Sequence, residues 1–121
     1  MIHPVDAVIR VLAPREAAGA QRVAGQPLPP GVAVRAASWL PALGGLLARM
    51  GGPAAAVTLG RTIVVHPGVP LTPRLLRHEL THVRQWQAHP FSFPVRYAWE
   101  FLLHGYEANP FEAEARAAEE D

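Results

Sequence analysis

Thirteen prolines and ten glycines, together 23 of 121 residues, divide this chain into short segments. Because proline interrupts helices and strands and glycine favours turns, each uninterrupted stretch is a candidate element. The longest stretch with helical periodicity runs from Pro73 to Ala88, between the N-capping residue Thr72 and a stop at His89-Pro90. Shorter helices are predicted at 4–13, 39–50 and 94–104, and from 110 onward.

Two β-like runs, 55–59 and 62–65, precede the longest helix. Gly60-Arg61 lies between them and predicts a tight hairpin. Residues 32–34 are a further candidate strand, whereas 14–31 are rich in Ala, Gly and Pro and are predicted to be a linker or an irregular crossing. We therefore predict an α+β chain in which a small antiparallel hairpin or three-stranded sheet packs on helices.

The composition suits a folded domain, because half of the residues are apolar and 17% are charged. There is no cysteine, which excludes disulfides, thiolate zinc fingers and cysteine nucleophiles. A metal site, if there is one, must use histidine and carboxylate ligands.

Charge is unevenly distributed along the chain. Residues 1–106 carry ten arginines and four acidic residues, a balance of +6, while residues 107–121 carry one arginine and six acidic residues, a balance of −5. The arginines are spread out, with no polybasic run, so nucleic-acid binding is not expected.

No targeting segment stands out in the sequence. The first residues lack a basic region followed by an apolar stretch, so we expect no secretory signal. The 13 uncharged residues 36–48 are too few to span a bilayer, which needs about 20. The default expectation is a cytoplasmic protein without a membrane span.

His78-Glu79-Leu80-Thr81-His82, in the middle of the predicted 73–88 helix, matches the pattern H-E-x-x-H. The two histidines are one turn and about 40° apart on a helix, so both imidazoles can reach one metal ion. Glu79 lies in the apolar arc of that helix, where an unpaired carboxylate is costly. A metal ion with its water would compensate the charge, and Glu79 could deprotonate that water. The alternative is two partly buried histidines, with Glu79 bonded to a neighbouring arginine.

A catalytic zinc site needs a third protein ligand. No histidine follows at the metzincin spacing, where Gln85 and His89 are the nearby candidates, so the acidic C-terminal stretch is the better source. Glu112 and Glu114 are about 200° apart on a helix, so only one should face the metal. We expect Glu112, with Glu114 as the next choice. The competing role for Glu112 is a capping box with Asn109 as the N-cap.

The run from Leu76 to Trp86, followed by the run from Tyr106 to Ala115, resembles the small gluzincin-type zincins. These are minimal metallopeptidase-like domains, many known only as uncharacterised bacterial HExxH proteins. The resemblance covers roughly residues 54–118 and includes the hairpin. It implies a zincin-like core over 54–121, with 1–53 as part of the same domain or as an appended arm.

The resemblance also implies a ligand set. In that family the two motif histidines and a glutamate on a later helix bind zinc, and the motif glutamate is the general base. Carried over, His78, His82 and Glu112 bind Zn²⁺ and Glu79 is the base. Related gluzincins have an aspartate where this chain has Arg116, which removes an expected carboxylate behind the ligands.

The activity that the resemblance implies is zinc-dependent hydrolysis of peptide bonds in a peptide or protein substrate. A second donor to the oxyanion is needed besides zinc. Tyr106 is the first choice, ahead of His104 and Tyr97, and a hairpin strand could hold an extended peptide by edge pairing. The main alternative is a zinc-binding scaffold that acts as a partner-binding or regulatory module. A toxin or effector cargo domain is a lesser one.

Two further groups are predicted to be structural. The three tryptophans, Trp39, Trp86 and Trp99, are expected in the core. Arg74, Arg77 and Arg84 form a stripe that a solvated helix face would explain.

Overall fold

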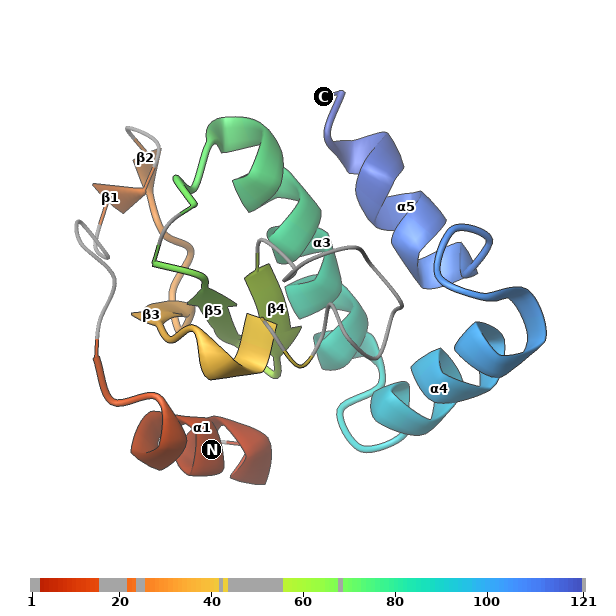
Figure 1. The fold of residues 1–121 in the computed structure, drawn as a ribbon, viewed down its shortest axis with the longest axis horizontal. Helices are drawn as coiled ribbons and strands as arrows, with labels where there is room; N and C mark the ends of the chain where they lie inside the picture. The colour runs from red at the N-terminus through yellow and green to blue at the C-terminus, as the bar shows by residue number, and fades with distance from the viewer. Residues whose placement is uncertain are drawn as a thin grey trace.

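The computed structural model describes residues 3–15, 22–23, 26–41, 43, 56–67 and 69–120. The fold is a mixture of α and β elements, in which helices surround a small β-sheet (Figure 1). The described elements are α1 (Pro4–Leu12), β1 (Arg22–Val23), β2 (Gln26–Pro27), β3 (Ala33–Ala36), β4 (Ala56–Leu59), β5 (Thr62–Val65), α3 (Pro73–Ala88), α4 (Phe93–His104) and α5 (Pro110–Ala118). None of these helices is both long and apolar enough to cross a membrane.

The main sheet has three strands in the order β3-β5-β4. β4 and β5 form the predicted antiparallel hairpin, in which Val57 pairs with Val64. β3 runs parallel to β5, so the sheet is mixed. Through this pairing, β3 joins the N-terminal part of the chain to the hairpin. β1 and β2 form a separate ladder within the predicted linker.

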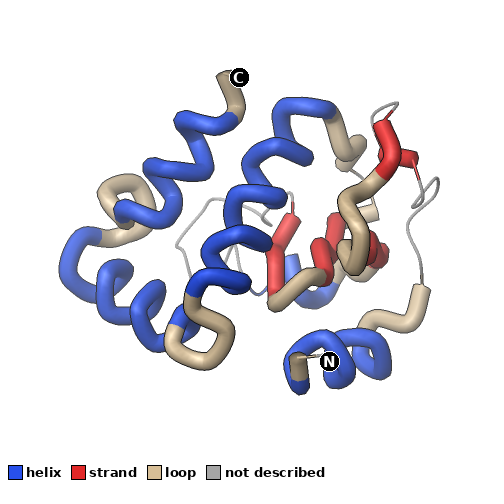
Figure 2. The backbone as a smooth tube through the Cα atoms, turned by 180° about the vertical axis from the view of Figure 1, so that it is seen from behind, coloured by secondary structure: helices blue, strands red, loops and turns tan. Residues whose placement is uncertain are grey.

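Helices cover both faces of the central strand. The side chains of a strand alternate between its two faces. Ile63 and Val65 therefore form a core cluster with Leu76 and Val83 of α3. Val64 points the other way and packs with Ile9 of α1. Figure 2 shows the same arrangement from behind, with α5 beside α3 on the side away from the sheet.

α1 is fixed to the turn of the hairpin by a buried carboxylate. Asp6 Oδ1 accepts hydrogen bonds from the Arg61 backbone N–H (2.9 Å) and from Thr62 Oγ1 (2.7 Å). Gly60 has φ +64°, and a Cβ there would lie 2.5 Å from Asp6 Oδ2. Only glycine therefore satisfies both the turn and this close approach.

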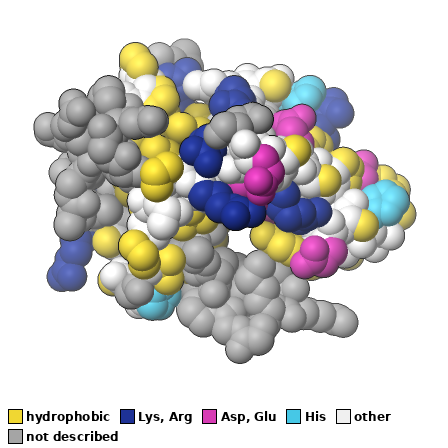
Figure 3. All heavy atoms as spheres, turned by 90° about the horizontal axis from the view of Figure 1, so that it is seen from above, with side chains coloured by type: hydrophobic (Ala, Val, Ile, Leu, Met, Phe, Trp, Pro, Cys, Tyr) yellow, Lys and Arg dark blue, Asp and Glu magenta, His cyan; other side chains and the backbone are white. Residues whose placement is uncertain are grey.

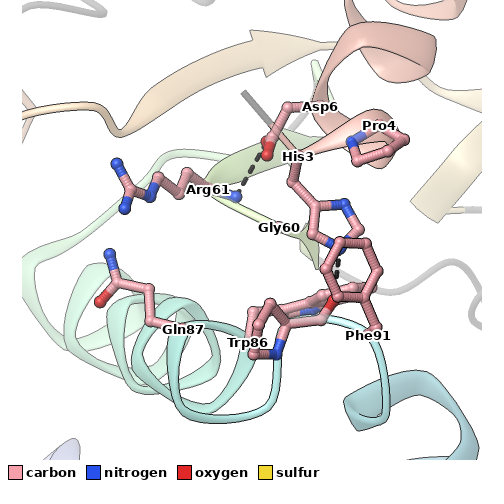
Figure 4. Close-up of a pocket in the computed structure, with 9 residues that line it drawn as sticks. His3, Pro4, Asp6, Gly60, Arg61, Trp86, Gln87 and Phe91 are labelled. Atoms are coloured by element: carbon pink, nitrogen blue, oxygen red, sulfur yellow. Dashed lines mark hydrogen bonds between the residues drawn. The ribbon is translucent and has the colours of Figure 1, made fainter. Parts of the chain in front are cut away.

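His3 attaches the start of α1 to the turn after α3 (Figure 4). Its Nδ1 accepts from the Val5 backbone N–H at 3.1 Å, which leaves Nε2–H to donate to the Pro90 carbonyl. The ring stacks on Phe91 and meets Trp86 edge-on. His3 thus acts as an N-cap that also contacts a distant segment.

α3 begins and ends as predicted. Thr72 accepts a hydrogen bond from the Leu75 backbone N–H at 3.2 Å, and the helix stops before His89.

α4 ends at Gly105, whose φ is +77°. At the start of α5, the fully buried Asn109 accepts from the Phe111 backbone N–H (2.9 Å) and donates to the Tyr97 carbonyl (3.3 Å). Asn109 therefore joins α5 to α4.

Two predictions about buried aromatic residues were wrong. Trp86 is in the core, but Trp39 is 44% exposed and Trp99 is 61% exposed. Trp39–Pro41 and Leu43 are helical, whereas the remainder of the predicted 39–50 helix lies outside the described residues.

Candidate metal centre

α3 and α5 bring two imidazoles and one carboxylate together. Glu112 Oε1 lies 3.1 Å from His78 Nε2 and 3.2 Å from His82 Nε2. One ligand atom from each of the three residues lies within 4.8 Å of the others, so the group could hold a metal ion. His82 and Glu112 are 7% and 4% exposed and His78 is 9% exposed, so the three side chains meet away from bulk water.

Hydrogen bonds and neighbouring charges shift the pKa values of these side chains. Burial by itself lowers the pKa of His78, but hydrogen bonds to Glu112 and Glu119 and the charge on Glu79 outweigh it and raise the pKa to about 9. Burial by itself raises the pKa of Glu112. The hydrogen bonds from both histidines and Tyr97 outweigh this effect and bring the pKa of Glu112 well below its usual value. Positive charge is therefore favoured at this point, whether a proton or a cation supplies it.

The other nitrogen of each imidazole is also engaged. His78 Nδ1 lies 3.0 Å from Glu119 Oε2, and His82 Nδ1 lies 2.8 Å from Gln85 Oε1. Both partners accept hydrogen bonds, so both rings carry hydrogen on Nδ1 and present Nε2 to Glu112. This is the orientation that a metal-binding histidine needs.

Glu119 is held in place by arginines of α3. Arg74 Nε donates to Glu119 Oε1 at 2.8 Å, and an Arg77 guanidinium N–H donates to the Glu119 carbonyl at 2.7 Å. Arg74, whose side chain is 63% exposed, lies on the predicted solvated face, and both arginines also hold Glu119 beside His78. Figure 3 views this end of the molecule and shows arginine side chains beside carboxylates.

The resemblance implied a carboxylate where this chain has Arg116, and the structure places a different carboxylate beside His78. Arg116 donates to the Glu107 carbonyl, and Glu119 contacts His78 instead. Glu119 follows Glu112 by seven residues, or two helical turns, and the helical period places such residues on one face. That spacing was the signal that could have identified it.

The structure separates the two candidate third ligands. Glu112 faces the histidines, whereas Glu114 Oε1 accepts from Gln85 Nε2 at 3.0 Å and lies behind His82. Gln85 also donates to the Phe111 carbonyl at 3.0 Å, so it links α3 to α5. Glu112 does not take the capping-box role, because its oxygens contact His78, His82 and Tyr97.

Glu79 lies beside this group and is 3% exposed. Its Oε1 accepts from Thr58 Oγ1 of β4 at 2.9 Å, and its Oε2 lies 3.9 Å from His78 Nε2. Its partner is thus a threonine and not the arginine of the alternative hypothesis. Burial raises the pKa of Glu79, although the charges of the two histidines oppose this change.

The candidates for a second donor occupy different places. Tyr97 OH donates to Glu112 Oε2 at 2.6 Å. Burial and the charges on Glu112 and Glu79 raise the pKa of Tyr106, so this phenol stays protonated near the same carboxylates. His104 is exposed and lies 3.3 Å from Glu100, so it takes no part in the group.

A cavity of about 260 Å³ lies at the other end of α3, beside the start of α1 (Figure 4). Its described lining includes His3, Arg61, Trp86 and Phe91 and none of the residues of the metal group. The cavity and the metal group are therefore separate features.

Comparison with known proteins gives one partial match. Residues 48–90 match the family model of the eCIS core domain, in which eCIS stands for extracellular contractile injection system. The match contains β4, β5 and α3, with His78, Glu79 and His82, and ends before Glu112. The description of that family names no reaction. No curated protein matches the chain. No solved structure matches it.

Proposed function

We propose that this chain is a zinc-dependent metallopeptidase with a zincin-like core. The observation that supports the proposal is the convergence of His78 Nε2, His82 Nε2 and Glu112 Oε1, with the Glu79 carboxylate adjacent. Two imidazole nitrogens and one carboxylate oxygen are a ligand set that zinc prefers in catalytic sites. Zinc bound there would act as a Lewis acid toward a carbonyl and would make water more acidic.

Glu79 is the proposed general base. It would take a proton from the attacking water and return it to the leaving amine. Its burial and its raised pKa support this role, because a base works best when its pKa approaches the working pH. Thr58 holds the carboxylate on the side facing His78.

We assign different roles to Tyr97 and Tyr106. The Tyr97 hydroxyl is committed to Glu112 Oε2, so Tyr97 would position the third ligand. Tyr106 remains the proposed hydrogen-bond donor to the oxyanion, since its hydroxyl stays protonated at neutral pH.

β4 is the proposed binding edge for an extended peptide. Within the described part of the chain, β4 pairs with β5 alone and lies at the edge of the sheet. Thr58 belongs to this strand and contacts Glu79, so a peptide paired with β4 would pass close to the base.

A zinc-binding scaffold is the second candidate. Two observations favour it: the partial match to a family named for an injection assembly, and a cavity that lies away from the metal group. In this role the ion would stabilise a module that binds another protein.

Metal analysis with matched variants separates the candidates. If the protein is a peptidase, the wild type should cleave a fluorogenic peptide library, and Glu79→Gln should bind zinc but not cleave it. If the protein is a scaffold, the wild type should bind zinc and cleave no peptide. Glu112→Gln should lose zinc and Glu114→Gln should keep it, because only Glu112 faces the imidazoles. Wild-type protein that takes up no zinc would refute both candidates.

A further inference from the structure

α4 carries a stripe of large apolar side chains that the described chain leaves open to solvent. Val95 is 71% exposed, Trp99 61%, Leu102 78% and Leu103 57%. A contiguous apolar patch of this kind is uncommon on a monomeric protein and usually marks an interaction site. We call these four residues the α4 stripe.

The α4 stripe lies opposite the metal group. On a helical wheel, Trp99, Leu102 and Leu103 all fall within about 80° of Val95, whereas Tyr97 lies about 160° away on the other side. Tyr97 contacts Glu112, so the inner face of α4 supports the metal group and the outer face has no partner in the described chain. Both views show α4 at the periphery of the molecule (Figures 1 and 2).

Three residues of the stripe form a self-complementary pattern together with Ala98, and Leu103 lies outside this pattern. Apolar residues at 95, 98, 99 and 102 are arranged symmetrically about a point between Ala98 and Trp99. In an antiparallel pair of identical helices, Val95 would face Leu102 of the second copy, and Ala98 would face Trp99. The small side chain of Ala98 leaves room for the indole ring. Such a two-fold pattern is what an isologous interface requires.

Charged residues lie beside the stripe. Arg96 and Glu100 lie on one flank of α4 and are centred on Ala98, half a residue from the axis between Ala98 and Trp99. Antiparallel pairing would bring Arg96 of each copy near Glu100 of the other. Within the chain, Arg96 contacts the Ser92 hydroxyl and Glu100 contacts the exposed His104, so neither has a strong partner to give up.

The available area also suits a dimer. The four side chains of the stripe, which are 57% to 78% exposed, amount to on the order of several hundred Å² in each chain, a large part of the ~800 Å² per partner of a standard interface.

We propose that α4 is a homodimerisation surface, through which two copies of this chain pair antiparallel about a two-fold axis between Ala98 and Trp99. The proposal is independent of peptidase activity, because it rests only on the outer face of α4. The charged flanks fix the register and direction of the pair.

The test is the mass of the full chain in solution at micromolar concentration, by light scattering and sedimentation. The wild type should have twice the chain mass of 13.1 kDa. Trp99→Glu and Leu102→Glu should each be monomeric, with unchanged circular dichroism and zinc content. Val11→Glu is the matched control: Val11 is 76% exposed on α1, outside the stripe, and this variant should remain dimeric.

A charge-reversal series tests the register. Arg96→Glu and Glu100→Arg should each weaken the dimer at low salt, and the double variant should restore it. A monomeric wild type, or a dimer that persists in Trp99→Glu and Leu102→Glu, would overturn the proposal. So would binding of a monomeric wild type to lipid vesicles through Trp99, since the occupant of the stripe would then be a membrane.

Discussion

Glu119 Oε2 lies 3.0 Å from His78 Nδ1, although the two residues are 41 positions apart in the chain. Glu119 is the C-cap residue directly after α5, and it contacts the same imidazole whose Nε2 faces Glu112 of that helix. α5 and its C-cap thus supply both the carboxylate that meets the two Nε2 atoms and the carboxylate that orients one ring.

Glu119→Ala should weaken zinc binding roughly 10- to 100-fold, because the ring of His78 loses the acceptor that fixes its orientation. A competition titration with a chromogenic chelator measures the zinc affinity of each variant. Glu120→Ala is the control, since Glu120 also pairs with Arg74 but does not contact His78. Equal affinities in the two variants would mean that Glu119 does not position the ligand.

Thr58→Val should raise the pKa of Glu79 further, because it removes the hydrogen bond that stabilises the buried carboxylate. The acid limb of the pH profile of kcat/KM should then move to higher pH, while Thr58→Ser keeps the hydroxyl and the wild-type profile. The free energy of unfolding at neutral pH should fall by about 1–3 kcal/mol in Thr58→Val. An unshifted acid limb would show that Glu79 is not the group that titrates.

The metal-free protein should lose stability as pH rises from 6.5 to about 9. His78 has a higher pKa in the folded protein than in the unfolded chain, so its protonated form stabilises the fold fully below pH 6.5. That contribution, at most about 3 kcal/mol, disappears as pH rises through the folded-state value. Zinc affinity should increase over the same range, because the ion replaces the proton.

Urea titrations of the apo protein at several pH values measure this effect. The pH dependence should be reduced in His78→Gln and retained in His104→Gln, because His104 is exposed and lies outside the group. A dependence that is the same in both variants would contradict the assignment to His78.

Gly60→Ala should destabilise the fold more than Gly105→Ala. Both glycines have positive φ, which costs an alanine about 1 kcal/mol. At Gly60 the new methyl group would also meet the carboxylate of Asp6 at 2.5 Å, whereas nothing lies within 4 Å at Gly105. Thermal unfolding at fixed pH gives the comparison. Equal losses would show that Asp6 moves aside freely.

Local signals in the sequence were enough to predict the elements that carry the metal group. Thr72 and the His89-Pro90 pair bound α3, and Gly60-Arg61 marks the hairpin. The i, i+4 spacing places His78 and His82 on one face of α3. The angle between Glu112 and Glu114 on a helix predicted only that one of them would face the histidines, and the resemblance to the gluzincin-type zincins favoured Glu112.

Contacts between distant segments could not be predicted in the same way. Gln85 lies one turn from His82 on α3, so the contact between these two residues is local. The contact of Gln85 with Glu114 depends instead on how close α3 lies to α5, which no local pattern encodes. The sequence predicted a helix over 94–104 but not which of its sides faces the protein. Its aromatic residues Phe93 and Tyr97 turn inward, and Trp99 is therefore left outside.

The parallel pairing of β3 with β5 has a consequence for the order of folding. β4 and β5 meet across a two-residue turn, so this contact closes quickly and at little loss of chain entropy. Pairing of β3 with β5 instead requires closure of the long loop between Ala33 and Thr62, which costs more chain entropy. We therefore expect the hairpin and α3 to be structured in the transition state for folding, and β3 to join late.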